Sequence, residues 1–421
     1  MKKTKRVLAL ILALLMVWGL SACGETAPDT TESNTTGDTP HSVVTAIPGD
    51  NQAWVYSFLR QGAFSSQGYY YCTVEGLVYF FDFSSGISVA LCSKAGCLHG
   101  EEPDNRKREN CEAHFSRMSA PMAFWEDHLY YVDSTPYGIS LFRRNAIGQE
   151  LTEMGKLGEE YTEAQKTVEI AYSAPTGNWL YYLAEVEGIV FDEDTNTTTF
   201  VPELDYIGRV DLNTGKEEIL FRQPIINRLD ALTLCAARED GALFLCRSGA
   251  IEGEELSTQE ALQQTTNSLK FWNGETGTVS TMLENSHPNF SSVPMVDGGK
   301  LYYATGSNDH HIYDLNTGGQ ELLCEDKPLY HLGGGYGMTL NAETKVWSLH
   351  DLQTGKILPY EAKKGWIMNM SDDGIILRAS YSAADTGSTG KSEYYYFTYE
   401  SLADGLQNAD LVKVYTLQHS V

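Results

Sequence analysis

The sequence predicts an all-β protein built as a single β-propeller of about seven four-stranded blades, with six or eight blades as alternatives. Three observations support this fold. One turn phrase recurs along the chain, a second phrase precedes its copies, and the 421 residues include 25 tyrosines and 38 glycines. Tyrosine favours strands and glycine favours tight turns, so the composition indicates many short strands joined by turns.

The recurring phrase is a short aromatic or apolar strand, then Asp or Asn, then a turn that ends in Gly, then another strand. Asp or Asn can accept hydrogen bonds from the backbone of the turn, and Gly supplies the positive φ that bulky residues resist. Each copy therefore predicts a β-hairpin. The copies are LVYFFDFSSGISVAL (77–91), YIGRVDLNTGKEEIL (206–220), LKFWNGETGTVSTML (269–283), HIYDLNTGGQELL (311–323) and VWSLHDLQTGKILPY (346–360).

The second phrase is a turn led by Gly or Asp that feeds a strand of largely apolar residues. Its copies are EDHLYYVD (126–133), GNWLYYLA (177–184), DGALFLCR (240–247), GGKLYYAT (298–305) and DDGIILRA (372–379). Together the two phrases define about seven units that start near residues 68, 122, 168, 230, 293, 330 and 366. A mean spacing of about fifty residues is typical of four-stranded propeller blades.

One stretch, DGGKLYYATGSNDHHIYDLNTGGQELL (297–323), resembles the YWTD-type blades of low-density-lipoprotein-receptor-like domains and the blades of Gram-positive surface lipoproteins. The YWTD tetrad itself is absent, so the resemblance implies a fold and no activity. The DLNTGK phrase is also similar to quinoprotein blades. The tryptophan that follows it in that family is missing here, so we expect no quinone cofactor.

The first residues predict export. A cationic head and the apolar run VLALILALLMVWG (7–19) precede Leu20-Ser21-Ala22-Cys23. The run is short for a membrane span, and this three-part pattern is typical of a signal peptide. The last four residues resemble the lipobox of bacterial lipoproteins, in which the cysteine receives a lipid and becomes the mature N-terminus. We expect a signal peptide over 1–22 and a lipid on Cys23; an ordinary signal peptide with a chance cysteine is the alternative.

Residues 23–52 form the predicted tether, and 53–421 the predicted propeller. The tether is rich in Thr, Ser, Asp and Pro, so it cannot bury enough apolar surface to offset the ordering of its backbone. These features predict an extracytoplasmic protein held on the cell membrane by its lipid.

The charge excludes one class of partner. Removal of the four cations in the signal peptide changes the formal charge from −26 to −30. A surface this acidic repels phosphate backbones, so we expect no nucleic-acid partner.

The stretch LCSKAGCLHGEEPDNRKRENCEAHF (91–115) holds the candidate metal site. Cys92, Cys97, His99 and Cys111 provide three thiolates and an imidazole, which complete a tetrahedral zinc shell, and His114 is a spare ligand. The alternative is a disulfide between Cys97 and Cys111 that closes a polar loop. An oxidising environment favours the disulfide, whereas an anaerobic one allows zinc. Under either interpretation the role is structural.

Spacing along the chain also suggests a facing pair of cysteines. If Asp240 and Gly241 are the central residues of a two-residue turn, Cys235 faces Cys246 across the hairpin, within reach of a disulfide. A shift of one residue would place the two thiols on opposite faces.

The segment FDEDTNTTTFVPE (191–203) places Asp192, Asp194, Asn196 and Glu203 at calcium-loop spacing. Threonine replaces the glycine that the sharp turn of such a loop needs, and no helices flank it. An acidic hairpin tip is therefore the favoured interpretation, and calcium is not expected.

The sequence contains no recognised catalytic motif. We therefore expect a lipid-anchored propeller that acts as a binding or scaffolding module for a saccharide, peptide or protein. The alternative is a carbohydrate-active enzyme, a glycan hydrolase or lyase on the same fold, because the fold does not determine the function. Carboxylates about 5–10 Å apart would favour the enzyme.

Overall fold

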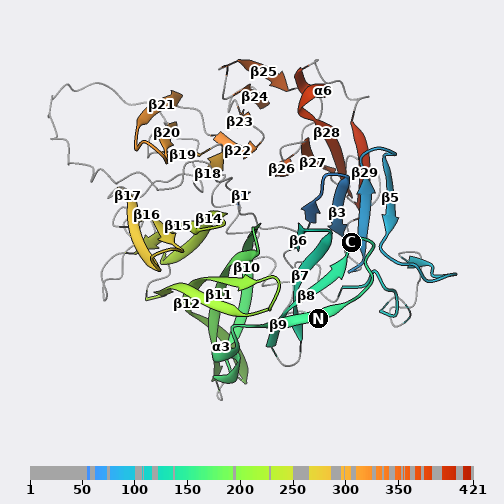
Figure 1. Ribbon diagram of the computed structural model, residues 1–421, viewed down its shortest axis with the longest axis horizontal. Coiled ribbons are helices and arrows are strands. Elements are labelled where there is room, and N and C mark those ends of the chain that lie inside the picture. Colours follow the sequence, from blue (N-terminus) through green and yellow to red (C-terminus); the bar gives the residue numbers. More distant parts are fainter. Residues whose placement is uncertain are drawn as a thin grey trace. The chain divides into compact units, whose positions relative to one another are not determined.

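A computed structural model of the chain provides the fold (Figure 1). All described residues belong to one compact unit, His41–Val421. Within them, no helix combines the length and the apolar character needed to span a membrane. The structure describes residues 55–56, 62–73, 76–99, 107, 109–115, 122–135, 138–192, 196–226, 229–249, 265–285, 295–297, 299–304, 310–324, 329–333, 336–340, 347–351, 354, 356–360, 366–370, 374–381, 391–403 and 411–418.

The described strands form seven antiparallel sheets, and six of these consist of four strands in the order of the sequence. The first three sheets are β2 (Gly62–Phe64), β3 (Gly68–Cys72), β4 (Val78–Asp82) and β5 (Ile87–Ala90); β6 (Met122–Trp125), β7 (His128–Thr135), β8 (Gly138–Asn145) and β9 (Thr152–Leu157); and β10 (Thr167–Thr176), β11 (Trp179–Asp192), β12 (Thr197–Asp211) and β13 (Glu217–Pro224).

The fourth sheet has a fifth strand from the N-terminal side. It consists of β1 (Val55–Tyr56), β14 (Ala231–Arg238), β15 (Gly241–Ser248), β16 (Thr266–Asn273) and β17 (Thr278–Asn285). The last three sheets are β18 (Met295–Asp297), β19 (Lys300–Ala304), β20 (His310–Asp314) and β21 (Gln320–Cys324); β22 (Leu329–Gly333), β23 (Tyr336–Leu340), β24 (Trp347–Asp351) and β25 (Ile357–Tyr360); and β26 (Trp366–Met370), β27 (Gly374–Tyr381), β28 (Lys391–Thr398) and β29 (Val412–Gln418). Two short helices, α3 (Glu159–Glu163) and α6 (Tyr399–Ala403), complete the described elements.

This architecture confirms the predicted β-propeller and its blades of four strands. Six of the seven predicted unit starts lie within two residues of the first strand of a sheet. The first unit was placed one strand late, at β3 rather than β2. The reason is that β2 is a three-residue strand, too short to show an alternating apolar pattern.

The turn chemistry predicted from the repeated phrase is confirmed in five blades. In each, the Asp or Asn side chain that ends the third strand accepts backbone N–H groups of the turn. Asp211 Oδ1, for example, accepts from Asn213 N at 2.7 Å and Thr214 N at 3.2 Å. Gly215 follows with φ of 71°, and a Cβ there would lie 1.9 Å from the carbonyl oxygen of Met154. The same role falls to Asp82, Asn273, Asp314 and Asp351.

The hydrophobic core consists of clusters between consecutive sheets. One cluster joins the β6–β9 and β10–β13 sheets through side chains such as Leu141, Leu157 and Tyr206, all fully buried. Comparable clusters join the first and second, third and fourth, and fourth and fifth sheets. Packing between the faces of neighbouring blades is the expected source of rigidity in a propeller.

The seventh sheet packs against the first through aromatic rings. Tyr71 of β3 stacks on Tyr415 of β29 with ring centroids 4.3 Å apart, and Tyr394 of β28 stacks on the same Tyr415 ring at 4.0 Å. Phe83 stacks on Tyr396 at 4.1 Å. Because the strands of each of these two sheets come from one end of the chain, this aromatic seam holds them together without a shared strand.

The β1 strand pairs with β14, the first strand of the fourth sheet. Val55 is opposite Ala237 and Tyr56 is opposite Ala236. The same short strand also lies against β10 and β18, the first strands of the two flanking sheets (Figure 1). β1 therefore joins the N-terminal side of the described chain to the first strands of three consecutive sheets.

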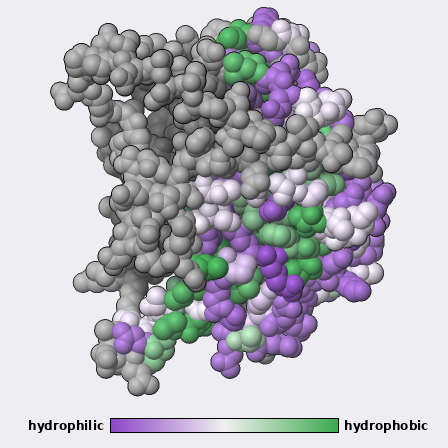
Figure 2. Space-filling view, turned by 90° about the vertical axis from the view of Figure 1, so that its left-hand side faces the viewer, coloured by the Kyte–Doolittle hydropathy of each residue, from purple (hydrophilic) through white to green (hydrophobic). Residues whose placement is uncertain are grey.

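One hairpin extends beyond its sheet. The pairing of β10 with β11 ends at Thr167 and Glu187, and that of β13 with β12 ends at Pro224 and Leu204. Residues 188–192 and 197–201 therefore pair only with each other, and we call this two-stranded ribbon the arm. Ile189, Phe191 and Phe200 of the arm are exposed. Figure 2 shows apolar surface in several places on one face of the molecule, among them the lower left of the view.

Candidate metal centre

The four residues predicted as metal ligands come together. One sulfur or nitrogen atom from each of Cys92, Cys97, His99 and Cys111 lies within 4.8 Å of every other. Cys111 Sγ and His99 Nδ1 are 3.6 Å apart. His114, the predicted spare ligand, is not part of this group; it forms a backbone bridge to Leu77 instead. The group can hold a metal ion.

Local backbone features bring the ligands together. Cys92 is the second residue after β5, and the chain then turns at Gly96, whose φ is 73°. The N–H of Cys97 donates to the carbonyl of Lys94, and His99 itself has φ of 51°. The chain returns through Cys111 to an edge contact in which Val78 N donates to Ala113 O at 2.8 Å. The ligand loop is thus fixed at both ends to the first blade.

The donor set fits zinc. Three thiolates and one imidazole are a common structural zinc shell, and bonds of about 2.3 Å place tetrahedral sulfur ligands roughly 3.8 Å apart. The four ligand atoms here all lie within 4.8 Å of one another, close enough to surround one ion. When bound, zinc would be held by Cys92, Cys97, His99 and Cys111 and would neutralise the thiolates. Since four protein ligands fill a tetrahedral shell, such a site is structural and has no open position.

The surroundings favour a thiolate at Cys92. Burial acts to raise its pKa, but backbone N–H groups of Lys94 and Glu112 and the neighbouring thiols outweigh burial and lower the pKa. Burial raises the pKa of Cys111 to about 12, although the backbone N–H of Ala113 opposes this. Adjacent thiols do not ionise together without a cation, and the backbone donors would serve as the outer shell of a bound metal.

The ligand loop also contacts the second blade. Arg144 of β8 donates to the carbonyl oxygens of Glu112 and, at 2.8 Å, Gly148, and its guanidinium lies 4.7 Å from the centre of the Phe115 ring. The carboxylate of Glu112 accepts from both the backbone and the hydroxyl of Ser93. These contacts make the loop a fixed joint between the first two blades.

The structure leaves the disulfide alternative as a prediction. The six cysteines whose side chains are described, Cys97 and Cys111 among them, are free thiols. The lipidation site Cys23, the signal peptide and the whole tether through residue 52 lie outside the described residues.

The expected facing pair of Cys235 and Cys246 is wrong. The turn is centred on Glu239 and Asp240, because Arg238 pairs with Gly241. The pairing then shifts between Leu234 and Ala236, so that Leu232 rather than Cys235 faces Cys246. The two thiols belong to different core clusters, on either side of the sheet. A bulge is a local irregularity that the strand pattern does not reveal.

The residues of the weak calcium-loop candidate are spread along the arm. Asp192 and Thr197 pair at the end of the arm, whereas Glu203 lies at its base and forms an ion pair with Lys166. Asn196 is in the turn with φ of 51°, and Asp194 lies outside the described residues. Extended strands separate the acids that a calcium loop would gather around one ion.

An acidic row that the sequence analysis missed crosses the third blade. Glu185 of β11 is opposite Glu169 of β10 and opposite Asp205 of β12. The Glu185 side chain retains accessible surface, yet dense protein around it, followed by the charges of Asp205 and Glu169, raises its pKa to about 7. Burial raises the pKa of Asp205 to about 6, against a hydrogen bond from Leu232 N at 2.9 Å. Strand register creates this row, so spacing along the chain could not indicate it.

The raised pKa of Asp205 predicts a pH-dependent stability. The folded state holds a proton that the unfolded state, with an ordinary pKa near 4, loses first. Stability from this group is therefore highest at low pH and falls as pH rises to about 6. Asp205→Asn is expected to stabilise the protein by about 2 kcal/mol at pH 8 and by much less at pH 4. Urea unfolding at both pH values measures this.

The exposed turn residue Asp82 is the control, because hydrogen bonds from Ser84 and Ser85 lower its pKa. Asp82→Asn should therefore change stability in the opposite direction at pH 8. Equal effects of Asp205→Asn at both pH values would contradict the prediction.

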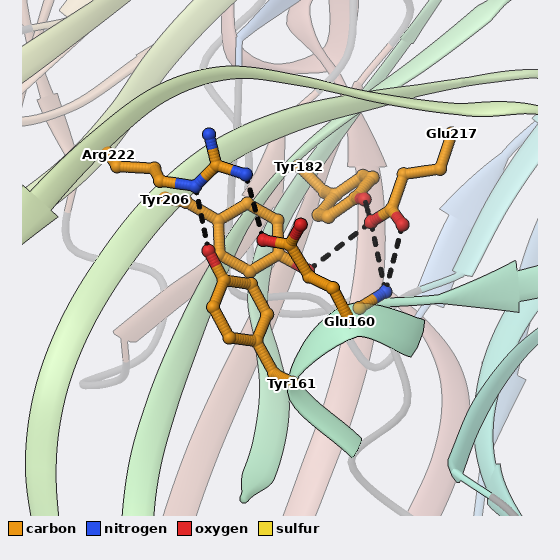
Figure 3. A network of polar contacts seen from close by, with 7 residues as sticks. Glu160, Tyr161, Tyr182, Tyr206, Glu217 and Arg222 are labelled. Atoms are coloured by element: carbon orange, nitrogen blue, oxygen red, sulfur yellow. Dashed lines mark hydrogen bonds and ion pairs between the residues drawn. The ribbon is translucent and has the colours of Figure 1, made fainter. Parts of the chain in front are cut away.

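A network of hydrogen bonds holds the segment around α3 that connects the second blade to the third (Figure 3). The carboxylate of Glu217 accepts from Tyr182 and Tyr206 hydroxyls and, with both oxygens at 3.0 Å, from Gly158 N just before α3. Burial raises the pKa of both tyrosines, so both remain proton donors.

Arg222 binds the short helix from the other side. It donates to the Tyr161 hydroxyl and to the Glu160 carboxylate, both at 2.8 Å (Figure 3). Every partner in this network is engaged by another protein group, which indicates a structural role.

Comparison with known proteins gives fold relatives and no family. No family model matches the chain, and no curated protein matches it. Among solved structures, an oligogalacturonate lyase in complex with manganese is 14% identical with a TM-score of 0.44, over 84% of this chain and 99% of that one. The β-propeller domain of the trilobed protease from Pyrococcus furiosus is 11% identical with a TM-score of 0.43, over 81% of this chain and 93% of that one.

A prolyl endopeptidase is 11% identical with a TM-score of 0.44. The match covers 72% of this chain but only 42% of the endopeptidase, so this chain spans less than half of that protein. The chain is thus a β-propeller module with a thiol-rich joint between its first two blades.

Proposed function

We propose that the protein is an extracytoplasmic propeller, anchored to the cell membrane by a lipid on Cys23, that binds a peptide or protein partner as a scaffold. The single observation that supports binding is the arm. Ile189, Val190 and Phe191 are each at least half exposed, and so is Phe200 on the paired strand. Large apolar side chains gathered in one exposed place are typical of an interaction site.

The construction of the rest of the molecule agrees with a scaffold. The sheets pack on one another through buried clusters, and the arm is held by the third blade, whose β11 and β12 continue into it. Recognition segments placed on a rigid framework lose little conformational entropy on binding. The thiol-rich joint, holding zinc under this proposal, would stiffen the first two blades further.

A photo-crosslinking amino acid at position 191, in the full chain expressed in a bacterium that processes lipoproteins, tests both parts of the proposal. We expect a crosslinked adduct of defined mass in the membrane fraction. The same substitution at Ile147, equally exposed at 62% on the second blade, should give none. With Cys23→Ala, the protein and its adduct should move out of the membrane fraction.

Equal crosslinking from positions 191 and 147 would contradict the binding role of the arm. Retention of the Cys23→Ala variant in the membrane fraction would contradict the lipid anchor.

A glycan hydrolase or lyase is the second candidate, and the acidic row is the observation that favours it. Glu185 and Asp205 lie on adjacent strands, and raised carboxyl pKa values are typical of general acids. Asp205, however, is only 8% exposed and accepts a hydrogen bond from Leu232 N, so the accessible acids of the row are Glu185 and Glu169. Glycoside hydrolysis uses such a pair of carboxyl groups on either side of a bound sugar. The arm presents the gathered apolar surface that is typical of an interaction site, so the binding function is better supported.

A further inference from the structure

The two faces of the arm are unequal. Ile189 is opposite Phe200, and Phe191 lies two residues along on the same face of the ribbon. Ile189 is 50% exposed, Phe200 is 51% exposed and Phe191 is 56% exposed. The other face carries Val190 and Val201, which are smaller. A two-stranded ribbon is marginally stable alone in water, so a third strand that covers the aromatic face would stabilise the arm.

The two edges of the arm differ as well. The β12 edge has Pro202 at its base, and Pro224 ends the neighbouring strand β13 opposite Leu204. Proline provides no N–H donor and blunts a strand edge. The β11 edge over 188–192 contains no proline, and within the described residues no strand pairs with it on the side away from β12. The β11 edge is therefore the one that can accept an additional strand.

Acidic residues flank the apolar part of this edge. Glu187 and Glu185 precede it in β11, and Glu169 lies opposite Glu185. At the far end Asp192 closes the strand, and the sequence continues with Glu193 and Asp194. The cation at the base, Lys166, is bound to Glu203. A strand that docks here meets negative charge before and after the apolar residues.

The acidic residues at the base of the arm have raised pKa values, which agrees with a shortage of cations nearby. Burial, followed by the charge of Glu169, raises the pKa of Glu187, and the pKa of Glu185 is raised to about 7. A nearby ammonium or guanidinium group would lower both pKa values and stabilise the charged carboxylates. The formal charge of −26 disfavours a second copy of the chain and an anionic lipid surface as occupants.

We propose that the β11 edge of the arm binds an extended basic polypeptide, which adds as a strand with its apolar side chains on the Ile189–Phe191–Phe200 face and its Lys or Arg residues near the acids at both ends. This inference rests on the proposed binding function and names the partner class. Main-chain hydrogen bonds supply affinity in such strand addition, and the alternating side chains supply specificity.

The probe is a fluorescently labelled peptide, Lys-Lys-Val-Thr-Val-Thr-Val-Lys-Lys, titrated against the full chain and followed by anisotropy. We expect saturable binding that weakens at least about ten-fold as ionic strength rises from about 0.05 to about 0.3 M. Phe191→Ser with Phe200→Ser should weaken binding at least about ten-fold, because the apolar contact is lost. The matched variant Val190→Ser with Val201→Ser, on the opposite face, should change it less than about three-fold.

A second peptide with Glu in place of each Lys should not bind. Equal binding of both peptides, no binding of the Lys peptide, or equal loss in the two double variants would overturn the proposal. A dimer that sedimentation equilibrium detects, and that the Phe191→Ser, Phe200→Ser variant abolishes, would also overturn the proposal. So would binding of the chain to zwitterionic vesicles that the same double variant abolishes. Crosslinking at position 191 in cells without peptide binding would retain the proposed function and reject only the basic partner.

Discussion

Chelation of the metal is expected to lower the free energy of unfolding by at least about 3 kcal/mol, because the zinc proposed for the thiol-rich joint binds only the folded arrangement. Cys92, Cys97, His99 and Cys111 are drawn together from both ends of a long loop, so the unfolded chain does not present them as a group. The protein should be purified without oxygen, and urea unfolding compared before and after a chelator. Native mass spectrometry of the same sample should show one zinc that acid removes.

Cys111→Ser is the test variant for this prediction, and Cys72→Ser is the control. Cys72 packs beside the same cluster but is not one of the four ligands. The Cys111 variant should have lost the response to chelator, whereas the Cys72 variant should keep it. A mass lighter by two hydrogens without metal, absent from the Cys111→Ser variant, would favour the Cys97–Cys111 disulfide in place of zinc.

Tyr71→Ala is expected to cost about 3–5 kcal/mol, because it removes the central ring of the aromatic seam from a well-packed site. Tyr71 is 3% exposed and stacks on Tyr415. It also stacks on Tyr79 in its own sheet, at 5.7 Å. The first and seventh sheets share no strand in the described chain, so the loss of these contacts acts directly on the joint between the two ends of the propeller. Denaturant unfolding measures the change.

Tyr71→Phe separates the ring from its hydroxyl. Burial raises the pKa of Tyr71 to about 12, so the hydroxyl is protonated in the folded protein over the ordinary pH range. The Phe variant keeps the stacking and should lose about 1 kcal/mol for the hydroxyl. A loss for Tyr71→Phe equal to that for Tyr71→Ala would assign the effect to the hydroxyl and contradict a stacking seam.

The repeat was sufficient to predict the blades because each hairpin turn is a local structure. The Asp211 carboxylate and Gly215 are four residues apart, and their roles follow from the turn alone. The cysteine ligands were also predictable, since zinc spacing depends mainly on residue type and loop length. The YWTD resemblance and the lipid on Cys23 stay predictions, because the described residues do not bear on them.

What sequence reasoning missed depends on register or on contacts between distant segments. The bulge at Cys235 shifts the pairing of β14 with β15 by one position, and no residue type in that strand indicates it. Glu169, Glu185 and Asp205 are far apart in sequence and meet only through strand pairing. The residues with calcium-loop spacing lie in and beside the arm. The motif is defined by spacing along the sequence, but here most of these residues are in extended strands that keep their side chains apart.

The position of β1 has a mechanical consequence. Among the described residues, a load applied at the N-terminal side of the chain first reaches Val55 and Tyr56, which pair with β14 of the fourth of seven sheets. Tension would therefore act on β14, in the middle of the sequence, and not on β2, the strand at which the first blade begins. If the N-terminal side of the chain is anchored to a membrane, the two-residue pairing of β1 with β14 would be the first contact to break under tension. Its loss would lengthen the connection before any blade bears the load.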